Sequence, residues 1–187
     1  MIHLLLIAGA LARTQNPVLE IETTKGRILV ELDEAHAPQT TRNFLRYVDA
    51  KRYDGGRVHR TVTMDNQPDK KIKIEVIQAG VNPKFAEKDW PPIKLEPTNK
   101  TGLTHLNGTI SMARDGADTA TSDFFICIGD QPSLDFGGKR NPDGQGFAAF
   151  GRVVSGMEVV RTIQRNPAKE QALTPPIEIL RIRRVKS

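Results

Sequence analysis

The chain has 187 residues, enough for one domain with a substantial hydrophobic core and too few for a large second one. Hydrophobic residues make up 38% and charged residues 26%, as in a soluble globular protein, and no run of about 18 apolar residues predicts a membrane span. The 27 basic and 22 acidic residues are interspersed, so the net charge of +5 argues against a nucleic-acid-binding surface.

The N-terminal segment differs in composition from the rest. Residues 2–12 form an almost unbroken apolar run that ends in small residues, and the chain turns polar from Arg13, which is typical of a secretory signal. We therefore expect residues 1–16 to be a leader and linker, residues 17–187 to form the domain, and the protein to be periplasmic or secreted. The run is short and lacks a positive flank, so the alternative is an N-terminal strand or helix packed on the domain of a cytoplasmic protein.

The first predicted elements are a β-hairpin and a helix. Apolar residues alternate in residues 18–24 and 26–32, and Lys25-Gly26 lies between them as the turn. Pro38 suits the first turn of a helix, whose apolar residues recur at spacings of three and four: Phe44, Tyr47 and Val48. We expect this apolar face to pack against a barrel.

The middle of the chain alternates strands with polar loops. Residues 57–62 and 72–80 have the composition of strands, and residues 63–73 form a polar loop between them. The next segment, residues 81–99, contains four prolines and is predicted to be irregular. Two further apolar runs, 110–113 and 122–128, flank small and polar residues, which is the pattern of two strands joined by a structured loop.

The last part of the chain predicts a loop, a strand, a helix and a final strand. The polar loop, residues 136–146, lacks the spacing of a phosphate or calcium loop, and residues 147–154 form a strand. Ser155 is placed to cap a helix that ends at Arg165, and residues 177–185 form the final strand. Together the elements predict a mainly β fold, a closed eight-stranded antiparallel β-barrel capped by two α-helices.

Residues suited to covalent or metal chemistry are scattered. The four histidines lack the spacing of a zinc site, and no Gly-x-Ser-x-Gly nucleophile motif is present. The single cysteine, Cys127, lies in an apolar run, so we interpret it as a core residue; a lone cysteine also excludes an internal disulfide. We expect no metal ion and no cofactor.

Three segments together resemble the cyclophilins, the peptidyl-prolyl cis/trans isomerases with a closed β-barrel: residues 53–60, 75–80 and 110–128. The resemblance extends from Val18 to the C-terminus. It implies an isomerase that accelerates rotation about X-Pro bonds in folding proteins, a reaction that needs no nucleophile because its barrier of about 18–20 kcal/mol comes from amide resonance. The implied partners are proline-containing polypeptides; we expect a monomer that neither binds nucleic acid nor inserts stably into membranes.

The resemblance also implies roles for individual residues. Arg60 would bind the substrate carbonyl and favour the twisted amide nitrogen, because its guanidinium is always charged and presents a rigid fork of N–H groups. Gln78 would orient Arg60, and Phe125 would form the floor of a proline pocket. The other implied substrate-binding residues are His59, Val76, Ala113, Arg114, Leu134 and Phe147.

Departures from the family pattern leave other functions open. Glu75 and Val76 stand where the family has a phenylalanine and a methionine, Asp123 replaces a glutamine, and the loop after Arg60 is about ten residues longer than usual. A reshaped pocket is compatible with a non-catalytic cyclophilin-like module or chaperone that binds proline-containing segments. A nucleic-acid-binding barrel is a third alternative, which rests only on the basic C-terminal residues.

Overall fold

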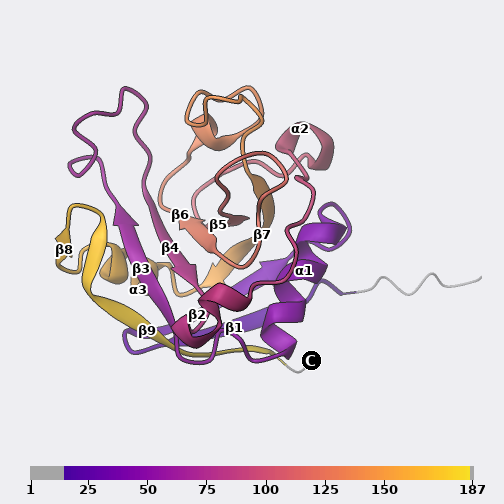
Figure 1. Cartoon of the computed structure of the whole chain (residues 1–187), viewed down its shortest axis with the longest axis vertical. Helices are drawn as coiled ribbons and strands as arrows, with labels where there is room; N and C mark the ends of the chain where they lie inside the picture. The colour runs from indigo at the N-terminus through magenta and orange to yellow at the C-terminus, as the bar shows by residue number, and fades with distance from the viewer. Residues whose placement is uncertain (1–14, 186–187) are drawn as a thin grey trace, which may run out of the picture.

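Residues 15–185, the part of the chain that this computed structural model describes, form strands wound into one sheet with short helices around it (Figure 1). The strands are β1 (Val18–Thr23), β2 (Gly26–Leu32), β3 (Gly56–Val62), β4 (Val76–Gly80), β5 (Thr109–Met112), β6 (Phe124–Cys127), β7 (Ala148–Ser155), β8 (Ala168–Lys169) and β9 (Ala172–Arg184). The helices are α1 (Pro38–Asp49), α2 (Thr98–Thr101) and α3 (Met157–Gln164), with 3-10 turns η1 (Pro83–Lys88) and η2 (Pro132–Leu134). The predicted leader lies outside the described residues except for its last two positions. No helix among the described residues is long and apolar enough to cross a membrane.

The sheet closes on itself into a barrel. Its strand order is β1-β2-β7-β5-β6-β4-β3-β9, neighbouring strands are antiparallel, and β1 pairs with β9 to complete the ring. The two-residue β8 pairs only with β9, so eight strands make the barrel. α1 packs against β7 and β9, and α3 packs against β2, β3 and β4. The predicted fold class is therefore confirmed.

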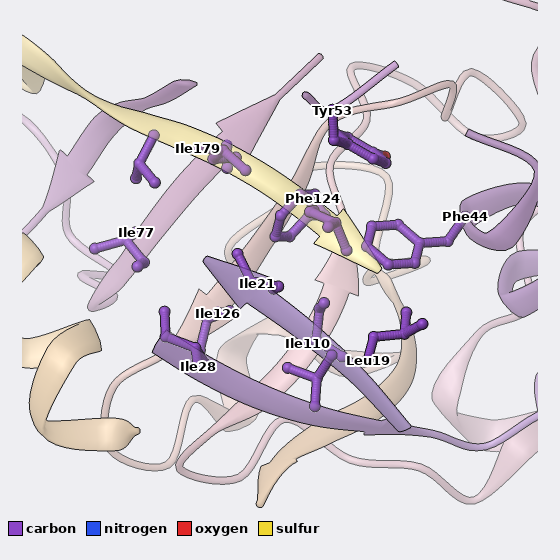
Figure 2. Close-up of a cluster of buried hydrophobic side chains, with 14 of the residues drawn as sticks. Leu19, Ile21, Ile28, Phe44, Tyr53, Ile77, Ile110, Phe124, Ile126 and Ile179 are labelled. Carbon is purple, nitrogen blue, oxygen red and sulfur yellow. The ribbon is translucent and has the colours of Figure 1, made fainter. Parts of the chain in front are cut away.

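The core forms where the apolar face of α1 meets the barrel. Phe44 is fully buried, and its ring centroid lies 5.2 Å from those of Tyr53, Phe124 and Phe150. Figure 2 shows the Phe44 ring beside Tyr53 and Phe124, with isoleucines from several strands completing the cluster. The opening hairpin supplies part of this cluster through its alternating apolar residues. Ile21 lies opposite Ile28, and both side chains point inward.

Two predicted strand boundaries and one cap were wrong. β4 begins at Val76 rather than at residue 72, because the side-chain amide of Gln67 bonds the backbone N–H and C=O of Ile74 in place of a neighbouring strand. β9 begins at Ala172, five residues before the predicted start, and continues through two prolines. Ser155 ends β7 and does not cap α3; the N-cap is Gly156, at φ 94°, where a Cβ would lie 2.4 Å from the Arg27 carbonyl oxygen.

The basic residues near the C-terminus are paired with carboxylates. Arg181, Arg183 and Arg184 lie 2.7, 2.8 and 2.8 Å from oxygens of Glu22, Glu20 and Asp49. The first two pairs join β9 to β1, and the third joins β9 to α1. The three described arginines of the cluster that suggested nucleic-acid binding are thus paired with carboxylates of the same chain, while Lys186 lies outside the described residues.

The ion pair between Arg184 and Asp49 gives a first prediction. The hydrogen bond from Arg184 lowers the pKa of Asp49 below its ordinary value of 3.8, so the ionised pair stabilises the fold above that pH and the stabilisation is lost as the pH falls through the lowered pKa. Both side chains are about half exposed. Replacing Asp49 with asparagine should therefore reduce the free energy of unfolding at pH 7 by no more than about 1 kcal/mol. Chemical denaturation at pH 7 and pH 2 checks this, since the two proteins should differ only at pH 7; a difference that persists at pH 2 contradicts it.

Candidate active site

Three neighbouring strands bring the predicted catalytic residues side by side. Arg60 on β3 lies opposite Gln78 on β4, and Gln78 lies opposite Phe125 on β6. Residues directly opposite each other on paired strands present their side chains to the same face. All three side chains accordingly line one cleft, whose volume is about 350 Å³.

Most of the predicted site residues meet in this cleft. His59 is the exception: it is the extra residue of a bulge between Val58 and Arg60, and it borders a neighbouring hollow beside Gly80 and Val81. The eight predicted residues that line the cleft are Arg60, Val76, Gln78, Ala113, Arg114, Phe125, Leu134 and Phe147.

The guanidinium of Arg60 is held by two amide side chains. Its Nη1 donates to Gln78 Oε1 at 2.9 Å, and its Nε and Nη2 donate to Gln171 Oε1 at 2.9 and 2.6 Å. Burial lowers the pKa of Arg60, yet an arginine stays protonated at neutral pH. Of its five N–H groups, one on each terminal nitrogen has no partner among the described residues and is available to a ligand.

The floor of the cleft is apolar. Phe125 is buried and meets Phe147 edge to face, with ring centroids 5.4 Å apart, while Val76 and Leu134 pack in the same cluster. Ile74 also belongs to this cluster and lines the cleft, which the sequence did not reveal because it lies at the end of a polar segment.

The departure at Glu75 does not place a charge in the cleft. The Glu75 carboxylate accepts a hydrogen bond from Gln164 Nε2 of α3 at 3.2 Å, and Glu75 is not among the residues that line the cleft. Its neighbours Ile74 and Val76 both are. The loss of the family's phenylalanine therefore leaves an apolar floor.

Asp123, which replaces the family's glutamine, is linked to Arg60 through the hydrogen bonds of Gln78. Its Oδ2 accepts from Gln78 Nε2 at 3.0 Å and lies 3.4 Å from His59 Nε2. Burial raises the pKa of Asp123, and the bond from Gln78 opposes that rise. Because one Gln78 amide joins Arg60 to Asp123, its Oε1 is fixed toward the guanidinium.

Two arginines that line the cleft form hydrogen bonds with the loops beside it. Arg114 donates to Asp143 at 2.7 and 2.9 Å and to the Gly146 carbonyl at 2.8 Å, and its guanidinium lies 5.1 Å from the centre of the Phe147 ring. Arg140, which the sequence did not mark, donates to the Ile72 carbonyl at 2.6 Å and lines the cleft. Arg114, predicted to bind substrate, thus also holds the loop before β7 against the cleft.

The far end of the cleft is polar, and the residues that line it were not predicted from the sequence. Asp89 accepts from the hydroxyls of Thr121 and Ser122 at 2.7 and 3.0 Å, and Asp115 and Thr119 complete this end. Asp89 comes from the proline-rich segment 81–99, whose irregular pattern gives no indication of where a side chain points. Within residues 15–185, no three His, Cys, Asp or Glu side chains gather as a metal site requires.

Cys127 lies beneath the cleft in the cluster that contains Val76 and Phe125. It is fully buried, and burial raises the pKa of its thiol far above the ordinary value. The native protein should therefore react with a thiol reagent such as Ellman's reagent at least about 100-fold more slowly than the protein unfolded in denaturant. Stopped-flow absorbance checks this, and comparable rates in the two states would contradict the assignment of Cys127 to the core.

Comparison with known sequences finds one family across nearly the whole described chain. Residues 18–185 match the family described as cyclophilin type peptidyl-prolyl cis-trans isomerase/CLD. A relative from Streptomyces antibioticus, peptidyl-prolyl cis-trans isomerase cyp18, is 37% identical and covers 78% of this chain and 82% of its own. Peptidyl-prolyl cis-trans isomerase A of Dickeya dadantii is 36% identical, covering 83% and 75%. Peptidyl-prolyl cis-trans isomerase B of Escherichia coli is 32% identical, covering 79% and 84%.

Comparison with solved structures finds the same barrel. A cyclophilin type peptidyl-prolyl cis-trans isomerase from Cryptosporidium parvum, crystallised in the presence of the dipeptide Ala-Pro, has a TM-score of 0.73 to this chain. It covers 91% of this chain and 99% of its own, at 22% identity. The structural similarity supports the fold, while the sequence relatives carry the family assignment.

Proposed function

Because the chain belongs to the cyclophilin-type peptidyl-prolyl cis-trans isomerase family and is itself such an isomerase, we propose that it acts as a monomer on X-Pro bonds of folding, exported proteins. The observation that carries the proposal is that the Arg60 guanidinium and an apolar floor formed around Phe125 share one cleft. A fixed N–H donor beside an apolar pocket for a proline ring would suffice to accelerate rotation of this bond.

Arg60 acts on the amide itself. Resonance between the amide nitrogen and the carbonyl creates a barrier of about 18–20 kcal/mol, and this resonance is lost when the bond is twisted. In the twisted state the nitrogen regains a localised lone pair, which accepts a hydrogen bond from Arg60. The bond is stronger in the transition state than in either planar isomer, so it lowers the barrier. No covalent intermediate is needed.

The apolar floor holds one side of the rotating bond. The proline ring lies on Phe125 between Val76, Leu134 and the edge of Phe147, while Ala113 borders the peptide backbone. Burying the ring anchors it as the preceding carbonyl turns. A proline-containing peptide as the ligand is supported by the structural relative crystallised with Ala-Pro.

The alternative of a binding module without turnover depended on Glu75 and Val76. Glu75 is engaged by Gln164 and does not line the cleft, and Ile74 lines the floor beside Val76. The chain therefore keeps both the cation and the apolar floor, and no observation favours the alternative.

Exchange NMR on a peptide with an Ala-Pro bond tests the proposed function. We expect the added protein to raise the cis/trans exchange rate in proportion to its concentration, while a chelator leaves the rate unchanged. Saturable binding without faster exchange would contradict catalysis and select the binding module. Mass spectrometry of the N-terminus of the exported protein tests the leader, and a retained apolar run would contradict export by cleavage.

A further inference from the structure

The Arg60 guanidinium is hydrogen-bonded on two sides. Only one of its two partners, Gln78, lies on a strand that lines the cleft. Gln78, the partner expected from the sequence, contacts Nη1 alone. Gln171 accepts hydrogen bonds from both Nε and Nη2, so it fixes the edge of the guanidinium that Gln78 does not reach. A planar group held on both sides cannot rotate about its last torsion without breaking a bond.

Gln171 is itself fixed in position. It lies in the turn between β8 and β9, and its backbone carbonyl accepts from the Thr61 backbone N–H at 2.9 Å. Its side-chain Nε2 donates to the Asn66 carbonyl at 3.1 Å, which directs Oε1 toward Arg60. The Gln171 amide therefore has one orientation in which both its Oε1 and its Nε2 are hydrogen-bonded.

Asn66 belongs to the long loop between β3 and β4, and it clamps the loop to this turn. Its side chain accepts from the Thr63 backbone N–H at 2.9 Å and donates to the carbonyls of Thr61 and Glu170 at 3.0 and 3.1 Å. Figure 1 shows the β3–β4 loop and the β8–β9 turn on the same side of the barrel, as these contacts require.

We propose that Gln171 is a positioning residue that presets the Arg60 guanidinium for the rotating amide, and that the β3–β4 loop holds Gln171 in place. This inference rests on the proposed function. Fixing a flexible arginine side chain costs rotamer entropy, and holding it in place before the substrate arrives removes that cost from the transition state. The long loop thereby acquires a role in the reaction although only its C-terminal end, at Ile74, lines the cleft.

Replacing Gln171 with methionine, which keeps the length of the side chain but has no acceptor for Arg60, tests the inference. We expect kcat on an X-Pro peptide to fall about 10- to 100-fold with KM nearly unchanged, because a small displacement of the donor affects the transition state while the pocket floor is intact. The matched control is Gln39→Met, the same change at an exposed glutamine of α1, which should leave kcat unchanged. Equal kcat values for the wild type and Gln171→Met would overturn the inference.

Two further measurements separate positioning from a general structural role. In an Arg60→Lys background, Gln171→Met should lower kcat by less than about 2-fold, because the residue acts through the guanidinium. The Arg60 Nε–H resonance should be protected from solvent exchange in the wild type and lose protection in Gln171→Met. A full loss of kcat in the lysine background, or an unchanged Nε–H, would overturn the inference. If the wild type does not accelerate isomerisation, the proposed function fails, and the Nε–H measurement still decides whether Gln171 holds Arg60.

Discussion

Replacing Arg60 with alanine should lower kcat/KM on an X-Pro peptide by about 100- to 1,000-fold, the loss expected when a preorganised donor is removed from a transition state. The side chain is a cation that lines the cleft with Phe125 and keeps N–H groups without a partner among the described residues, and Gln78 and Gln171 have no positive charge to substitute for it. Exchange NMR or a protease-coupled assay measures the change, and circular dichroism verifies that the barrel is folded.

The same strand offers a matched control for this variant. Arg57 is an exposed arginine on β3, and it borders hollows outside the cleft. Arg57→Ala should therefore retain the wild-type kcat/KM. Equal losses in the two alanine variants, or full activity in Arg60→Ala, would contradict the role of Arg60. Arg60→Lys should fall between the wild type and Arg60→Ala, since lysine keeps the charge and loses the planar fork.

Replacing Phe44 with alanine should lower the free energy of unfolding by about 3–5 kcal/mol, which is the usual cost of truncating a buried phenylalanine. Its ring touches three other aromatic rings where α1 meets the barrel, so the cavity left behind would be lined by rigid groups that collapse poorly. For a domain of this size the melting temperature should fall on the order of 10 °C. Chemical and thermal denaturation measure both quantities.

Phe136 provides the control for Phe44. It is 43% exposed in the loop before β7, so Phe136→Ala should change the free energy of unfolding by less than about 0.5 kcal/mol. A loss below about 1 kcal/mol for Phe44→Ala would contradict the central place of α1 in the core.

Local patterns in the sequence were sufficient to predict the elements whose formation depends on residues close together along the chain. The opening hairpin and the start of α1 at Pro38 were predicted within a residue, because alternation and three-to-four spacing are properties of short segments. The start of β4 was not predicted correctly, since it depends on hydrogen bonds between the Gln67 amide and the backbone N–H and C=O of Ile74. The cap of α3 was missed because the need for glycine at position 156 arises from the Arg27 carbonyl of a distant strand.

The residues of the candidate site likewise fall into those that the sequence identified and those that only the structure reveals. Arg60, Gln78 and Phe125 were identified through resemblance, and the strand register brings them together. Gln171 lies 111 residues from Arg60 in a polar turn that carries no motif, and only the folded contacts reveal it. Ile74 was hidden for a similar reason, because its place in the pocket follows from the path of the preceding loop.

The ring of strands closes through its first and last members, β1 and β9. A growing polypeptide lacks one wall of this ring until Ala172–Arg184 has left the ribosome, so the barrel is completed only after its last strand has been synthesised. The same topology that secures the finished barrel thus makes its completion depend on the last strand.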